Sequence, residues 1–199
     1  MPVNWSLDIE LHEWMTVPSA PRDVAEWRAD VTALFELLAE FEFEFESESE
    51  SEVIVNELVP GSSDYNATLD SLLEFAAALS DDEVLVVGLG LVGHWPLPVI
   101  VSVTATGHGL LDLPEAAGAS GGLPIDRPTV DDIAQGDGIR VTRLDLDDDG
   151  ALWATVACAR QTGDVVVVLT WRTAQLELVP QFSPLLEELL AHVTIGSDA

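Results

Sequence analysis

The chain has 199 residues, with 36 Asp and Glu side chains against only 7 Lys and Arg, and its formal net charge is −29. Nucleic acids and anionic membranes attract clustered basic side chains, so this charge balance argues against both as partners. Hydrophobic residues make up 48% of the chain, which is too many for a disordered acidic protein. We therefore expect a packed core and a single α+β domain over residues 1–199.

The N-terminal half predicts one strand followed by two helices. Apolar residues alternate with polar ones from Trp5 to Leu11, which is the pattern of a half-buried strand. Apolar residues then recur every three or four positions over 21–40, which predicts an amphipathic helix with proline in its first turn. A second helix is predicted over 64–79, and its inner stripe consists of Tyr65, Leu69, Leu72, Ala76 and Leu79.

The C-terminal half is rich in strand-forming residues. Five segments are dense in β-branched or alternating apolar residues, namely 83–91, 99–106, 139–146, 152–160 and 165–173. Short turn sequences join the last three strands into a meander. A Gly-, Ala- and Pro-rich loop is expected over 113–128, with a frayed turn within it as an alternative. A short helix is expected over 129–134 and a final helix over 180–193. These elements predict an α+β fold with a central antiparallel sheet flanked by amphipathic helices.

The acidic segment, residues 40–52, has glutamate at every even position and Phe or Ser at the odd ones. If the segment is extended, its carboxylates line one face and form a candidate contact for a basic protein or peptide. The alternative is a strand that starts at Phe41, has a solvated glutamate face and ends in a flexible loop. The candidate protein-binding residues are Glu42, Glu44, Glu46, Glu48 and Glu50.

Gly88, Gly90 and Gly93 match the spacing of a dinucleotide-binding fingerprint directly after an apolar strand. That function requires a helix that begins within the motif and points its N-terminus at the pyrophosphate. Two prolines and a second strand-forming run follow instead. We therefore expect a strand that turns into a hairpin, and no nucleotide cofactor.

Asp145, Asp147 and Asp149, followed by Gly150, match the first half of a calcium-binding loop. The twelfth position of such a loop supplies a bidentate glutamate, but here it is Val156, and the flanking elements are predicted strands. A tight turn is expected, with a weak calcium site as the alternative.

No histidine pair has the spacing of a zinc-hydrolase motif. His94 and His108 face each other if the strands that bear them are paired, but we expect each to be an ordinary surface or capping histidine, and a dispersed enzyme site around them is the alternative. The one cysteine, Cys158, excludes an internal disulfide and is expected to be buried in a strand.

The segment 165–193 ends a strand with Trp171, Arg172 and Thr173 and continues into a Leu-rich helix. This segment resembles the closing strand and helix of uncharacterised actinobacterial proteins of Mog1/PsbP-like α/β architecture. The resemblance implies a sandwich of sheet and helices, and it assigns no catalytic residues.

Together these features predict a non-enzymatic, acidic adaptor for a basic protein partner, similar in role to an immunity protein or a secretion chaperone. The alternative is an enzyme with a dispersed site around His94 and His108. Residues 1–11 have neither a basic stretch nor an apolar stretch of the secretory type, which favours a cytoplasmic protein. The sequence indicates no oligomeric state.

Overall fold

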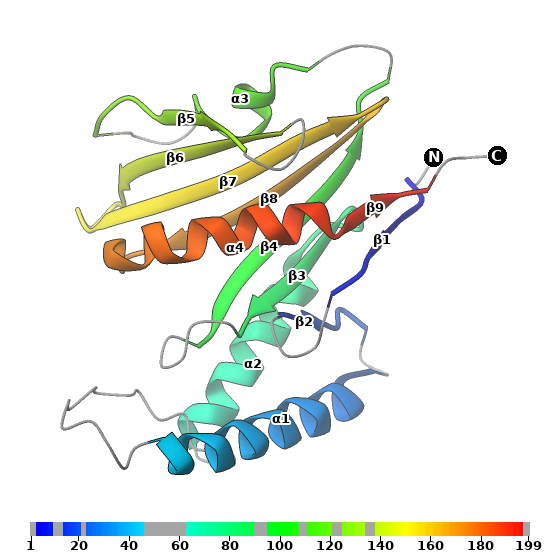
Figure 1. The fold of residues 1–199 in the computed structure, drawn as a ribbon, viewed down its shortest axis with the longest axis vertical. Coiled ribbons are helices and arrows are strands. Elements are labelled where there is room, and N and C mark those ends of the chain that lie inside the picture. Colours follow the sequence, from blue (N-terminus) through cyan, green and yellow to red (C-terminus); the bar gives the residue numbers. More distant parts are fainter. Residues whose placement is uncertain are drawn as a thin grey trace.

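The computed structural model describes residues 3–9, 14–20, 23–45, 63–89, 95–107, 111–120, 125–133 and 138–196. Within these residues the chain forms an α+β fold with two sheets and several packed helices (Figure 1). None of the described helices combines the length and the apolar character that crossing a bilayer requires.

The main sheet has seven antiparallel strands in the order β2-β3-β4-β8-β7-β6-β5. The prediction of a central antiparallel sheet is confirmed, and so is the meander formed by β6, β7 and β8. The strand bounds are β2 Trp14–Val17, β3 Glu83–Gly88, β4 Leu97–Ala105, β5 Thr129–Asp132, β6 Gly138–Leu146, β7 Leu152–Thr162 and β8 Val165–Thr173.

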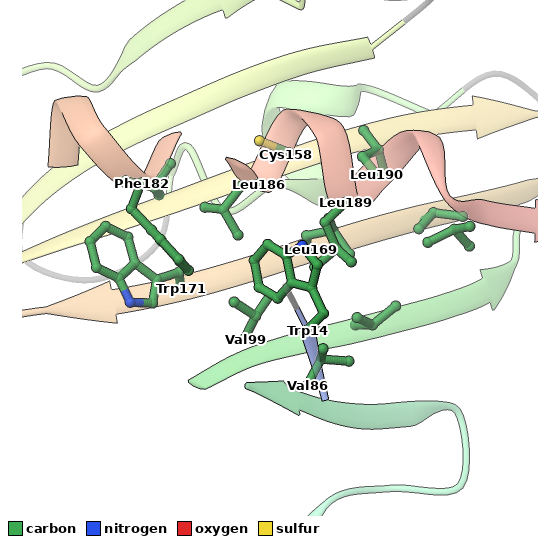
Figure 2. Packing of buried hydrophobic residues seen from close by; sticks show 14 of the residues in the cluster. Trp14, Val86, Val99, Cys158, Leu169, Trp171, Phe182, Leu186, Leu189 and Leu190 are labelled. Carbon is green, nitrogen blue, oxygen red and sulfur yellow. The ribbon is translucent and has the colours of Figure 1, made fainter. Parts of the chain in front are cut away.

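Helix α4, Val179–Ala191, covers one face of this sheet, after a single 3-10 turn at Leu176–Leu178. Figure 2 shows Phe182, Leu186 and Leu189 of this helix directed toward the strands. Phe182 is fully buried, and its ring centroid lies 4.5 Å from that of Trp171. Burial of each such large side chain contributes about 1.5–3 kcal/mol.

The opposite face of the sheet is covered at both ends. Helices α1, Val24–Phe45, and α2, Ser63–Ala78, pack against β2 and β3. The predicted inner stripe of α2 is buried at its first four positions, and Leu79 lies just beyond the end of the helix. The short helix α3, Leu113–Ala116, packs against β6 and β7. The middle of this face, over β4 and β8, therefore lies between two helical covers.

Two short strands form a separate sheet. β1, Trp5–Leu7, pairs antiparallel with β9, Val193–Ile195, which follows α4. The two ends of the described chain therefore lie side by side (Figure 1). The strand predicted from Trp5 is confirmed in this shorter form, whereas β9 lies where we expected the end of the last helix.

The helix predicted over 129–134 is wrong, because Thr129–Asp132 forms the edge strand β5. Its register on β6 places Val130 opposite Val141 and Asp131 opposite Arg140. A cross-strand ladder and an ion pair between Asp131 and Arg140 therefore stabilise the extended conformation over a helix start.

Candidate functional site

The acidic segment is not extended where it begins. Helix α1 continues to Phe45, so Glu42 and Glu44 lie in a helix and the strand predicted to start at Phe41 is wrong. Extending an existing helix costs little, because only its nucleation is unfavourable, and Glu is a good helix former. Positions two apart in a helix are separated by about 200° around the axis, so the alternating pattern does not mark one face there. Glu46, Glu48 and Glu50 lie outside the described residues.

The glycine fingerprint begins at the end of a hairpin strand. Gly88 is the last residue of β3 and pairs with Leu97 in the neighbouring antiparallel strand β4. A dinucleotide-binding unit instead joins its first strand to a parallel neighbour through a crossover helix. The predicted hairpin is confirmed. Gly90 and Gly93 lie outside the described residues.

Gly88 is required by close packing. A Cβ atom at this position would lie 2.9 Å from Cε2 of Phe182 and 3.1 Å from Cζ3 of Trp14. Both distances are shorter than the contact of about 3.5 Å at which two carbon atoms attract each other. The glycine therefore lets two buried aromatic rings contact the backbone of β3.

Asp145 and Asp147, which belong to the alternative calcium site, make separate contacts. Asp147 accepts hydrogen bonds from Nε1 of Trp153 at 2.9 Å and from the backbone N–H groups of Asp149 and Ala151. The hydrogen bond from Trp153 and those from the backbone hold the pKa of Asp147 below its ordinary value. Asp145 instead lies in β6, and its Oδ2 accepts from Nε of Arg143 at 2.6 Å. No three His, Cys, Asp or Glu side chains within the described ranges are arranged to hold a metal ion.

His94 and His108 both lie outside the described residues, so the structure does not place the alternative enzyme site. Cys158 is fully buried in β7, as predicted. Burial, with a smaller contribution from the nearby Glu187, raises the pKa of its thiol to about 12. This cysteine is therefore a packing residue, because a thiol with so high a pKa is a poor nucleophile.

Three arginines in the described residues form ion pairs with carboxylates. Arg140 lies 2.6 Å from Glu187 and 2.9 Å from Asp131. Burial lowers the pKa of the Arg140 guanidinium, but these two partners outweigh burial and the pKa lies above its ordinary value. The other two pairs join Arg143 to Asp145 and Arg28 to Asp70, which lies at the surface.

Arg160 donates instead to the backbone carbonyl of Val193 at 2.7 Å. Four arginines therefore have a carboxylate or carbonyl partner within the described residues.

A groove of about 450 Å³ lies on the sheet face opposite α4, between Phe75 of α2 and strand β6. Its floor contains a cross-strand row in which Thr155 of β7 lies between Arg143 of β6 and Arg172 of β8. We refer to these three residues as the arginine row. Two of the chain's seven basic side chains therefore lie in one groove.

The sequence did not predict this groove. Its residues come from α2 and four strands, and only the strand register brings them together. The available signal was the alternation in β6, where Arg143 and Asp145 occupy the positions that face the same side as buried Val141. Oδ1 of Asp145 is buried without a hydrogen-bond partner in the described part of the chain, which is uncommon in folded proteins.

A second hollow, of about 370 Å³, lies between β5, β6 and the start of α4. Its lining includes Arg127 and two threonines, Thr129 and Thr142, which pair across the strands. Arg127 lines this second hollow and does not line the first groove.

No protein-family model matches the chain, and no curated protein matches it. A solved structure from Bacteroides thetaiotaomicron VPI-5482 is similar over 60% of this chain and 41% of that one, with 11% sequence identity and a TM-score of 0.38. The similar region thus spans less than half of that protein. These comparisons assign no family.

Proposed function

We propose that this chain is an acidic, non-enzymatic adaptor that binds a basic protein or peptide. The observation that supports the proposal is the surplus of carboxylates. If each arginine neutralised one carboxylate, 29 acidic side chains would still be unmatched. A field of this sign accelerates the encounter with a cationic partner and disfavours anionic ones.

The internal ion pairs support the same proposal. Arg28, Arg140 and Arg143 contact carboxylates of their own chain, so they contribute little positive charge at the surface. A basic partner therefore meets a surface with few competing cations. The partner class that fits is a basic toxin domain or a basic secretion substrate. We also propose that the scaffold is a Mog1/PsbP-like sandwich.

The acidic segment is the candidate contact. Glu42 and Glu44 lie near the C-terminal end of α1, and Glu46, Glu48 and Glu50 follow in sequence. The segment 40–52 has seven glutamates among thirteen residues, and this density of negative charge attracts a basic partner. The segment therefore offers a contact whose attraction depends on charge more than on shape.

The test is affinity capture from a lysate of the organism that encodes the chain, followed by mass spectrometry. Three baits are compared: the wild type, a variant with the five candidate glutamates replaced by glutamine, and a matched control. The control removes the same number of charges from exposed carboxylates elsewhere, at Asp30, Glu74, Asp81, Asp148 and Glu188.

The proposal predicts that one basic protein binds the wild type and the control variant but not the glutamine variant. Glutamine has a helix propensity close to that of glutamate, so the variant keeps its fold. Equal capture by all three baits would remove the acidic segment as the contact. If no basic protein is captured and the chain turns over a small substrate, the alternative function as an enzyme is favoured.

A further inference from the structure

We propose that the groove of the arginine row is a binding site for a small carboxylate with an apolar tail. This site is separate from the acidic segment. It would give the protein a small-molecule ligand in addition to its proposed protein partner.

The cation at one end of the row is held in place but not neutralised by an ion pair. The guanidinium of Arg172 lies over the ring of Trp153, with Cζ 4.7 Å from the ring centroid. Trp153 is itself fixed by its hydrogen bond to Asp147. In the described part of the chain Arg172 makes no ion pair within 4 Å. The aspartate turn thus orients Arg172 through the indole ring, and the N–H groups of Arg172 remain for a ligand.

The cation at the other end of the row is also fixed. Nε of Arg143 donates to Asp145, and Nη1 donates to the backbone carbonyl of Gly118. A guanidinium has five N–H donors, so these two bonds leave donors over. The groove contains two guanidinium groups and the carboxylate of Asp145, and Asp147, beside Trp153, interacts electrostatically with Arg172. What the groove offers a carboxylate is therefore the unused N–H donors of two guanidinium groups rather than a net positive charge.

The geometry suits a carboxylate. Arg143 and Arg172 are each one strand away from Thr155, so their backbones lie about 10 Å apart on one face. Thr155 and Thr170 add hydroxyl groups to the floor between and beside them. Guanidinium groups bind carboxylates through short, charge-assisted hydrogen bonds.

The rest of the lining suits an apolar tail. Phe75, which is 40% exposed, forms one wall, and Ile100, Pro98 and Leu146 also line the groove. The volume falls in the range of about 300–1,000 Å³ that is typical of small-molecule sites. An apolar body of a few carbon atoms can therefore be covered while its carboxylate reaches the arginine row.

The acidic surface does not prevent this binding. At physiological ionic strength, charges farther away than about 8 Å are largely screened. The two guanidinium groups and the carboxylate of Asp145 are local to the groove, so they affect its affinity for an anion more than the distant carboxylates do. The net charge of the chain affects mainly the rate at which an anion arrives.

The test uses three probes: hexanoate, 1-hexanol of the same chain length, and acetate, which has the charge but no tail. Binding is followed by NMR, through the backbone amides of β7 and β8 and the side-chain Nε–H signals of Arg143 and Arg172. We expect hexanoate to shift these signals saturably at millimolar concentration, and hexanol and acetate to bind at least about tenfold more weakly.

The matched variants are Arg172→Gln and Arg127→Gln, which changes the exposed arginine of the second hollow. The first should weaken hexanoate binding about tenfold and the second should not change it. The proposal is overturned if hexanol binds as well as hexanoate, if no probe shifts the arginine signals, or if the two variants bind alike. The Nε–H shifts in the wild-type chain decide the matter even if a variant does not fold.

Discussion

Replacement of Gly88 by alanine tests whether this glycine serves packing. The backbone of Gly88 has no positive φ, so its conformation alone does not require glycine. The added methyl group would lie 2.9 and 3.0 Å from two ring carbons of Phe182. That ring has no room to move, because it is fully buried between Trp14 and Trp171 at centroid distances of 5.7 and 4.5 Å. Overpacking of this kind costs about 1–3 kcal/mol.

A smaller effect opposes this cost. Alanine loses less backbone entropy on folding than glycine, which stabilises the variant by about 0.5–1 kcal/mol. The expected net loss is therefore about 1 kcal/mol, within a range of about 0–2.5 kcal/mol. For a domain of this size, each kcal/mol lowers Tm by roughly 2–4 °C. Urea denaturation followed by tryptophan fluorescence measures the loss, with Trp14 and Trp171 among the reporters.

Phe182→Leu provides the control for Gly88→Ala. Leucine is shorter than phenylalanine, so in its presence the added methyl group should be neutral or stabilising, with a coupling of at least about 1 kcal/mol between the two sites. An unchanged or raised stability of Gly88→Ala in the wild-type background would refute the packing argument.

Three further predictions concern charge and burial. Arg143→Met leaves Asp145, which is 5% exposed, without its partner, so this variant should lose about 3 kcal/mol in the free energy of unfolding. Arg28→Met should lose less than about 1 kcal/mol, because the partner of Arg28 is exposed. Equal losses in urea denaturation would contradict this. Because the pKa of the Cys158 thiol is about 12, this thiol is ionised in only about one molecule in 10⁴ at pH 8, so a thiol reagent should modify it only after unfolding. Rapid modification of the native protein would show that the thiol is accessible. Folding lowers the pKa of Asp147, so the ionised carboxylate stabilises the folded state. This stabilisation is complete at pH values above the ordinary pKa of about 3.9, and it is lost as the pH falls through the pKa in the folded state. Asp147→Asn should therefore lower stability at pH 7, and the difference from the wild type should shrink in acid; a difference that does not depend on pH would exclude a role for the charge.

The sequence predicted the long elements well, because their periodicity covers many residues. Four of the five residues in the predicted inner stripe of α2, and the whole of β8, were predicted correctly. In both, a regular pattern and tertiary burial favour the same conformation. The short strands β2 and β9 were missed, since three or four residues carry too little pattern to distinguish strand from loop.

Two errors show where local signals lose to context. Thr129 followed by two aspartates is typical of a helix start, but pairing with β6 determines its conformation. The alternation in the acidic segment is typical of a strand, but α1 continues through Glu42 and Glu44. In each case the competing interaction comes from a neighbouring element that the local pattern does not contain.

The candidate groove could not be predicted, for a different reason. Arg143 and Arg172 are far apart in sequence, and only the register of β6, β7 and β8 places them on either side of Thr155. The aspartate turn was identified from its sequence, but its hydrogen bond to Trp153, and through it the orientation of Arg172, depends on side-chain geometry.

The dependence of the association rate on ionic strength tests the proposed function most directly. Once the basic partner is identified, stopped-flow mixing of the two proteins measures the association rate constant at ionic strengths between about 0.01 and 0.15 M. Over this range the Debye length falls from about 30 to 8 Å. The account predicts that the association rate constant falls by about tenfold or more while the dissociation rate constant changes much less. An association rate constant that is indifferent to salt would contradict electrostatic attraction as the basis of binding.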